Sequence, residues 1–237
     1  MWRGYHKLDP HVFERLSSVE STYPESSSPG RVPLGAFALV LDDLIPSLQL
    51  SEIEQLASES GYDEALLNTG DIKQEQGVKN EARKSKRSVF RSQECAIRIW
   101  EIVKDFLPPL EEVPGPRWKG WAPVTVNPVL RVLSYSSDDF FEVHQDGSYQ
   151  SDDGNKSFLT LQIYLNNGGG EDFKGGATRF FIPPPKSQPD GPITCTDVVP
   201  RRGRMIIFQH NLWHEGERVV SGTKRVLRSE IMFAKHD

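Results

Sequence analysis

Apolar and polar side chains alternate with a period of two residues through much of the second half of the chain. The alternation is cleanest over residues 158–165, where the apolar positions are Leu159, Leu161, Ile163 and Leu165. Because successive side chains of an extended strand point to opposite faces, this segment predicts a strand with one face in the core. The opposite face carries Thr160, Gln162 and Tyr164. That face either lines a cavity or meets solvent, and the pattern leaves both alternatives open.

Further short apolar runs, separated by glycine and proline turns, predict other strands of a β-rich structure. An early run at 37–41 predicts a buried strand. Later runs predict strands at 130–135, 141–144, 193–199, 203–208 and 224–233. The paired glycines 175–176 favour a sharp turn or a close backbone approach before the next strand.

Helical periodicity is confined to two segments in the first half. Ser51 and Glu54 have the spacing of a capping box, which predicts the start of a helix that ends near Gly61. Its expected apolar stripe consists of Leu48, Ile53 and Leu56. A second helix is expected from about residue 92 to residue 107, where two prolines stop it.

Two segments beside these helices lack apolar periodicity. Residues 63–87 carry many lysines and arginines and predict a charged loop, with a substrate lid as the functional alternative. Residues 109–128 mix proline and tryptophan and also predict a loop.

The order of these elements predicts an α+β, mainly β fold. Its core is expected to be a double-stranded β-helix, or jelly roll, buttressed by the N-terminal helices. Residues 1–33 are expected to form a partly disordered extension, and residues 34–237 a single domain. Within that domain the helical buttress is expected over 34–110 and the jelly-roll core over 121–235.

Composition excludes several classes of function. The formal net charge of the 237 residues is −5 and no basic stripe is visible, so nucleic-acid binding is not expected. No apolar run is long enough for a signal peptide or a membrane span, so a cytoplasmic or nuclear location is expected. Cys95 and Cys195 provide neither a disulfide framework nor zinc-site spacing. The oligomeric state is left open.

The candidate chemistry lies in the predicted strand and turn around His144 and Asp146. Two residues apart in a strand, these side chains point the same way and offer an imidazole and a carboxylate to a metal. A second histidine would complete the two-histidine, one-carboxylate triad of non-haem iron(II) oxygenases. On strand geometry alone, either His210 or His214 could be that histidine, because the two would share a face.

Six segments in the same order resemble the prolyl 4-hydroxylase-type Fe(II)/2-oxoglutarate dioxygenase family. The matching segments are 131–135, 144–147, 164–166, 175–180, 200–208 and 214–224. Each is unspecific alone, and their common order across 129–233 carries the resemblance. It implies that His144, Asp146 and His214 hold Fe(II), with 2-oxoglutarate as cosubstrate, O2 as oxidant and ascorbate as an optional cofactor. It also implies hydroxylation of a C–H bond with release of succinate and CO2.

The resemblance also implies a cation for the far carboxylate of 2-oxoglutarate. In prolyl 4-hydroxylases this is a lysine ten residues after the second histidine, and Lys224 lies at that distance from His214. Arg228 shares a strand face with Lys224 and ranks second, whereas Arg225 points to the opposite face and ranks third. Tyr135 and Thr160 resemble cavity positions that hydrogen-bond the cosubstrate, with packing or a solvated strand face as the alternative.

Two other classes of function stay open. A cupin-like metal enzyme would use the same triad without 2-oxoglutarate and would not need Lys224 or Arg228. A non-catalytic jelly-roll binding module would not need the triad. The substrate is expected to be a small molecule or a peptidyl residue, and a prolyl residue is the expectation that the resemblance suggests.

Overall fold

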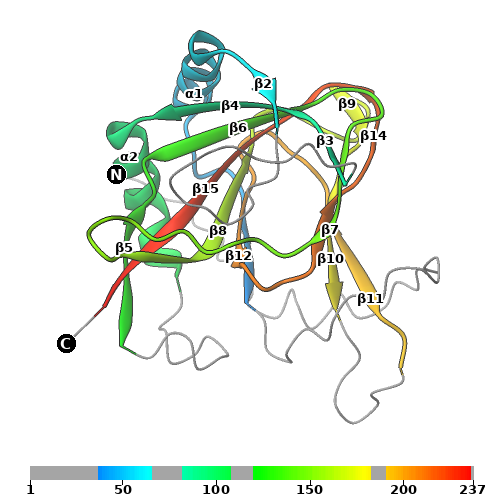
Figure 1. The fold of residues 1–237 in the computed structure, drawn as a ribbon. Helices are drawn as coiled ribbons and strands as arrows, with labels where there is room; N and C mark the ends of the chain where they lie inside the picture. Colours follow the sequence, from blue (N-terminus) through cyan, green and yellow to red (C-terminus); the bar gives the residue numbers. More distant parts are fainter. Residues whose placement is uncertain (1–36, 66–81, 108–119, 183–190, 236–237) are drawn as a thin grey trace.

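Two antiparallel sheets build the core of the protein. The computed structural model describes residues 37–65, 82–107, 120–182 and 191–235. In both sheets, strands far apart in sequence lie side by side, as expected for a jelly roll (Figure 1). The expected mainly β fold with a jelly-roll core and N-terminal helices is therefore confirmed.

The larger sheet has eight strands. In spatial order they are β1 (Ala38–Leu41), β12 (Met205–Gln209), β8 (Lys156–Tyr164), β15 (Lys224–Lys235), β6 (Val129–Tyr135), β4 (Lys86–Arg91) and β2 (Asp63–Glu64), with β5 (Trp121–Val126) paired to β15.

The smaller sheet has five strands, and a two-stranded ribbon accompanies it. The five are β11 (Thr194–Val198), β10 (Thr178–Ile182), β13 (His214–Gly216), β7 (Phe140–His144) and β3 (Arg83–Lys84). The ribbon consists of β9 (Phe173–Gly175) and β14 (Val219–Gly222).

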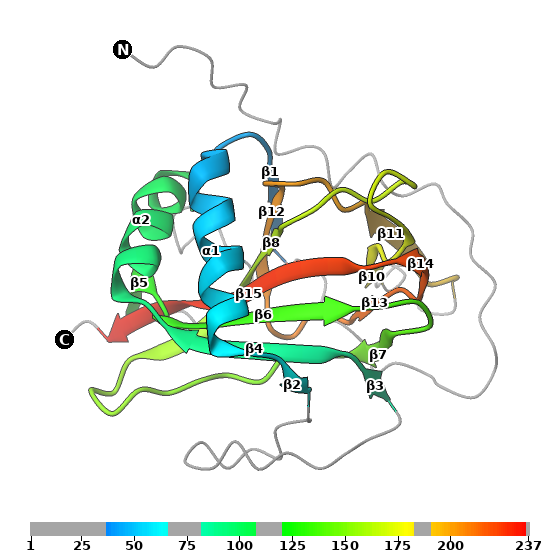
Figure 2. The same cartoon turned by 90° about the horizontal axis from the view of Figure 1, so that it is seen from above.

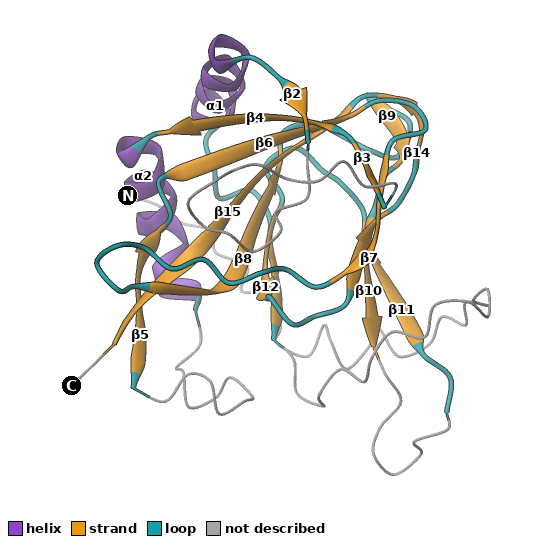
Figure 3. Ribbon diagram, in the orientation of Figure 1, coloured by secondary structure: helices purple, strands orange, loops and turns teal. Residues whose placement is uncertain are grey.

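Two helices cover one face of the larger sheet. They are α1 (Ser47–Ser60) and α2 (Gln93–Val103), the latter continued by a 3₁₀ turn over Lys104–Phe106. Figure 2 shows α1 and α2 on the same side of β15, β6 and β4. Figure 3 shows the two helices next to each other, away from β10 and β11 of the smaller sheet. The apolar cluster between helices and sheet includes Ile53, Ile99, Leu161, Ile163 and Leu227.

A second apolar cluster fills the space between the two sheets. It includes Tyr164, Phe180, Ile206, Phe208 and Val226. Strand β8 contributes to both clusters, because its apolar positions face the helices and Tyr164 faces the smaller sheet. Thr160 and Tyr164 are both 0% exposed, so the second face of β8 lines the interior and the solvent alternative is wrong.

Helix α1 starts earlier than the capping-box pattern predicts. It begins at Ser47 after Pro46, whose fixed φ suits a helix entrance, so Ser51 lies inside the helix. Leu48 is 85% exposed, and the buried stripe is Gln49, Leu50, Ile53 and Ala57. Glu54, instead of capping the helix, forms an ion pair with Arg202 at 2.8 Å. The expected end at Gly61 is confirmed.

Helix α2 agrees with the sequence pattern. The Ser92 side chain accepts a hydrogen bond from the Cys95 N–H at 3.2 Å and caps α2.

The two segments expected as loops contain strands. The charged segment 63–87 contains β2 and β3 and enters β4, and residues 66–81 of it lie outside the described part. These strands are short or charged, so apolar alternation does not reveal them. Strand β5 contains Pro123 and, among the described residues, pairs with β15 alone, as expected where proline joins a sheet.

The predicted N-terminal extension over residues 1–33 lies outside the described residues, so the proposed division of the chain stays a prediction. Across the described part, neither helix has the length and apolar character needed to cross a membrane.

We expect Gly222→Ala to destabilise the fold far more than Gly154→Ala. Both glycines have positive φ, +80° and +86°, so alanine at either site carries a backbone penalty of about 1 kcal/mol. At Gly222 an added Cβ would also overlap the carbonyl oxygen of Asp172, whereas at Gly154 it would meet nothing within 4 Å. Urea denaturation should give a loss of about 3 kcal/mol or more for Gly222→Ala and about 1 kcal/mol for the control. Equal losses would contradict the close approach of β14 and β9.

Candidate metal centre

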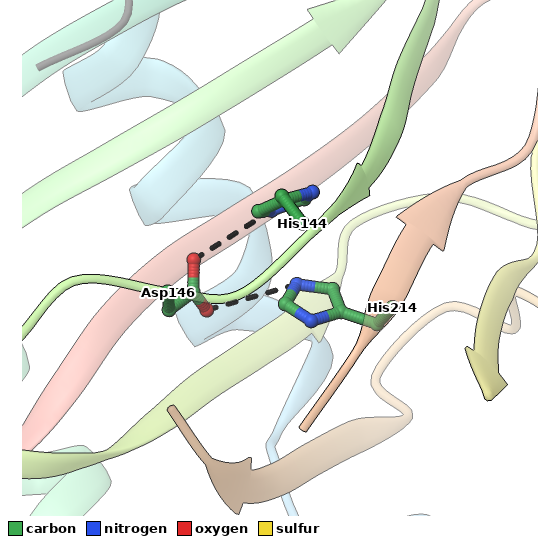
Figure 4. Close-up of side chains that lie close together, drawn as sticks. All are labelled: His144, Asp146 and His214. Atoms are coloured by element: carbon green, nitrogen blue, oxygen red, sulfur yellow. Dashed lines mark ion pairs between the residues drawn. The ribbon is translucent and has the colours of Figure 1, made fainter. Parts of the chain in front are cut away.

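Neighbouring strands of the smaller sheet bring the three predicted metal ligands together. His144 ends β7 and His214 begins β13, and the antiparallel register places the two residues opposite each other. Their ring centroids are 4.2 Å apart. Asp146 follows β7 by two residues, and its carboxylate faces both imidazoles (Figure 4).

The three side chains offer one ligand atom each to a common point. The Asp146 Oδ1 atom is 3.7 Å from His144 Nε2, and its Oδ2 atom is 3.7 Å from His214 Nε2. All three ligand atoms lie within 4.8 Å of one another. Small side-chain movements would bring them to metal bonds of about 2.0–2.2 Å.

Backbone carbonyl groups fix the tautomer of both histidines. His144 Nδ1 is 2.7 Å from the Glu142 carbonyl oxygen, and His214 Nδ1 is 2.9 Å from the Leu212 carbonyl oxygen. A carbonyl oxygen can only accept, so each Nδ1 carries the proton and each Nε2 presents a lone pair to the centre.

The electrostatic surroundings keep these donors free of protons. Burial, reinforced by the neighbouring His214, lowers the pKa of His144 to about 3. Burial also lowers the pKa of His214. For Asp146, burial alone would raise the pKa, but the positive charge of Arg228 and the nearby imidazoles hold it far below its ordinary value. Two neutral imidazoles and one carboxylate form a donor set that suits Fe(II).

Both oxygens of Asp146 are held by neighbours from the larger sheet. Arg228 Nη2 donates to Oδ1 at 2.8 Å, and the Thr160 hydroxyl donates to Oδ2 at 2.5 Å. Arg228, expected as second choice for the cosubstrate carboxylate, is thus paired with Asp146. Thr160, expected to hydrogen-bond the cosubstrate, also contacts Asp146, and a contact of either residue with the cosubstrate stays a prediction.

Lys224 is a buried cation between the two sheets. It begins β15, is 3% exposed, and its Nζ lies 5.3 Å from the ring centroid of Tyr135 and 5.5 Å from that of Tyr164. Within the described residues it forms no ion pair. Burial lowers its pKa to about 7, opposed weakly by the charge of Glu217. Arg225 points to the helix side of the sheet, where it pairs with Glu54 at 3.5 Å.

Further side chains adjoin the candidate metal ligands. The Phe141 ring stacks on the His144 imidazole at 3.6 Å, and the Arg83 guanidinium lies 4.6 Å from the Phe141 ring centroid. The structure places His210, the rival of His214, outside the ligand cluster, with its ring bonded to Thr160 and Ser157. These contacts depend on strand register, which a single sequence does not specify.

We expect metal affinity to change little between pH 8 and pH 6. With the pKa of His144 near 3 and that of His214 also lowered, neither imidazole must lose a proton to bind a metal in this range. Two exposed histidines with ordinary pKa values of about 6.5 would weaken binding as the pH falls through that value. Anaerobic Co(II) titration followed by visible absorption measures this dependence. A tenfold drop in affinity from pH 7 to pH 6 would contradict neutral imidazoles.

Solved structures with this arrangement of strands include several prolyl hydroxylases. A prolyl-4-hydroxylase from Pseudomonas putida matches with a TM-score of 0.55 and 16% identity, covering 82% of this chain and 91% of that one. A Trichoplax adhaerens prolyl hydroxylase, solved with a hypoxia inducible factor peptide, gives 0.55 and 17% and covers 82% of both chains. The viral collagen prolyl hydroxylase of Paramecium Bursaria Chlorella virus-1, solved with 2OG, gives 0.51 and 17% and covers 84% and 97%. At these identities the likeness concerns the fold.

The part of the chain that carries the candidate metal ligands matches a known family model. No curated protein matches the chain. Residues 130–229, which include His144, Asp146 and His214, match the model of the 2OG-Fe(II) oxygenase superfamily. The match spans the strands on which the jelly-roll fold groups the triad, so in this region the chain is similar to the 2OG-Fe(II) oxygenase superfamily.

Proposed function

We propose that the chain is an Fe(II)- and 2-oxoglutarate-dependent hydroxylase acting on a peptidyl substrate, with a prolyl residue as the first candidate. In this proposal, His144, Asp146 and His214 hold Fe(II). The iron supplies oxidative chemistry when 2-oxoglutarate and O2 are bound, with release of succinate and CO2. The remaining work of the chain is to bind, orient and shield these partners.

One observation carries the proposal: Lys224 is a buried cation without an anionic partner among the described residues. Burying an unpaired charge is costly, so such a group is expected to receive an anion in the working protein. The side chain lies between the sheets, on the same face of β15 as Arg228, which reaches the triad. A dicarboxylate that reaches both the metal and Lys224 satisfies this cation. Tyr135 and Tyr164 flank its ammonium group and exclude water from it.

Lys224 and the geometry of the triad disfavour the two other classes of function. A cupin-like enzyme without 2-oxoglutarate would leave Lys224 unpaired. A non-catalytic module would not need three ligand atoms within 4.8 Å or two imidazoles held in the same tautomer. Arg228 is already paired with Asp146, and Arg225 with Glu54, so Lys224 is the proposed anchor.

Support for a peptidyl substrate comes from the fold. The Trichoplax structure of similar fold was solved with a peptide fragment bound. In this chain the partly exposed His144 marks the accessible side of the triad, and Phe141 and Arg83 adjoin it there. We therefore place the substrate beside Phe141, where an aromatic face and a cation are available for contacts.

We expect the metal-loaded protein to release succinate from 2-oxoglutarate in the presence of its substrate. A screen of proline-containing peptides, free amino acids and small acceptors, with succinate as readout, tests the reaction and the substrate class together. His214→Ala should abolish turnover. Under anaerobic conditions, Fe(II) with 2-oxoglutarate should also give a weak visible absorption band. If wild type gives neither band nor succinate, the proposed reaction is wrong.

We expect the affinity for 2-oxoglutarate to fall as the pH rises above 7. Lys224 has a pKa of about 7 in the free protein, so above that pH it must take up a proton before it can pair with a carboxylate. The apparent Kd should then rise by about tenfold per pH unit between pH 7 and pH 9. Lys224→Arg should remove this dependence, because a guanidinium stays charged.

The matched control is Lys235→Ala, at the exposed end of the same strand. It should leave both the affinity and its pH dependence unchanged, whereas Lys224→Ala should weaken binding at every pH. If Lys224→Ala binds 2-oxoglutarate as wild type does, a different residue is the anchor.

A further inference from the structure

Next to Asp146 lies a buried line of polar side chains with no role in the proposed reaction. The Thr160 hydroxyl, which donates to Asp146 Oδ2, is 2.9 Å from His210 Nδ1. The other ring nitrogen, His210 Nε2, is 2.9 Å from Ser157 Oγ. Ser157 Oγ in turn accepts the N–H of Tyr149 at 2.7 Å. Thr160 and Ser157 are 0% exposed and His210 is 7% exposed.

Only one direction of donation satisfies every group in this line. The ionised Asp146 carboxylate can only accept, so the single proton of the Thr160 hydroxyl is used there. The Thr160 oxygen must then accept from His210, which requires a proton on Nδ1. With this proton on Nδ1, Nε2 presents a lone pair and accepts from the Ser157 hydroxyl. The Tyr149 N–H completes the line by donating to Ser157.

The reverse tautomer of His210 would break this line. With the proton on Nε2, the Thr160 hydroxyl would have two acceptors and one proton, so one close contact would set two lone pairs against each other. An unsatisfied buried polar group of this kind costs about 1–3 kcal/mol. The surroundings therefore select the His210 tautomer that supports Asp146.

His210 also holds the backbone of Asp146. The N–H of Asp146 donates to the His210 carbonyl oxygen at 2.9 Å, and the His210 N–H donates to the Phe158 carbonyl oxygen at 3.1 Å. Asp146 comes from the smaller sheet, whereas Thr160 lies on β8 of the larger sheet and His210 directly follows β12. These hydrogen bonds therefore connect Asp146 with residues of two strands of the larger sheet.

We propose that His210 is a positioning residue of the metal centre, whose Nδ1–H acts through Thr160 to hold the Asp146 carboxylate in its metal-binding orientation. This inference rests on the proposed function insofar as the triad binds a metal. His210 itself touches neither metal nor cosubstrate, and its effect is on the geometry of one ligand. Partners of this kind typically change metal affinity by about 10–100-fold when removed.

The test compares two amide substitutions at His210. The asparagine amide nitrogen can take the place of Nδ1, so His210→Asn keeps the donor to Thr160. Glutamine places its amide near Nε2, so His210→Gln loses that donor while keeping a polar group at Ser157. The probe is Co(II), titrated anaerobically without 2-oxoglutarate and followed by its visible spectrum. We expect a Kd within about threefold of wild type for His210→Asn and a Kd about 10–100-fold weaker, with an altered spectrum, for His210→Gln.

A second pair of variants tests the next link and guards against a folding defect. Thr160→Ser keeps the hydroxyl and should bind Co(II) as wild type does, whereas Thr160→Val should lose as much affinity as His210→Gln. Combining Thr160→Val with His210→Gln should add nothing further, because both act on one hydrogen bond. Thermal unfolding without metal identifies any variant that does not fold, and the other pair then carries the test.

Two results would overturn the inference. One is equal Co(II) affinity for His210→Asn and His210→Gln, whether retained or lost, which would leave His210 only a packing role. The other is independent, additive losses for Thr160→Val and His210→Gln. Failure of the proposed reaction looks different: wild type would bind Co(II) but release no succinate, and the Asn and Gln variants would still differ.

Discussion

The arrangement of the site depends on the buried carboxylate of Asp146 and on how it is held. Its two imidazole neighbours come from paired strands of the smaller sheet, while Arg228 and Thr160 reach it from the larger sheet. A buried carboxylate is stable only when its charge and its lone pairs are matched. Asp146 therefore connects the two sheets at the point where a metal would bind.

The charges around this carboxylate are balanced in pairs. Glu230 accepts from Arg228 at 3.2 Å and from Arg131 at 3.4 Å, and its second oxygen accepts from Asn127 at 2.8 Å. Two arginines thus face two carboxylates, Asp146 and Glu230, in one continuous network. Lys224 stands apart from this network and, among the described residues, forms no ion pair.

The sequence suggests the candidate metal ligands and Lys224 because the residues that point to them are close together along the chain. His144 and Asp146 are two residues apart, and Lys224 lies at a fixed distance from His214 along one stretch of chain. The contacts of Arg228 and Thr160 with Asp146 carry no local signal, because they depend on which strands pair. Strand β15 lies between β8 and β6, and in this register Arg228 reaches Asp146. Thr160 is 14 positions and Arg228 is 82 positions away from Asp146 in the sequence.

Neighbouring residues at the start of β15 serve opposite layers of the molecule. Lys224 turns into the space between the sheets, and Arg225 turns outward to Glu54 on α1. A single peptide unit therefore separates the helical layer from the interior cation. The only link between α1 and Lys224 along this route is therefore one partly exposed ion pair followed by one peptide bond, so the helical layer and the interior lysine are neighbours through the backbone of β15.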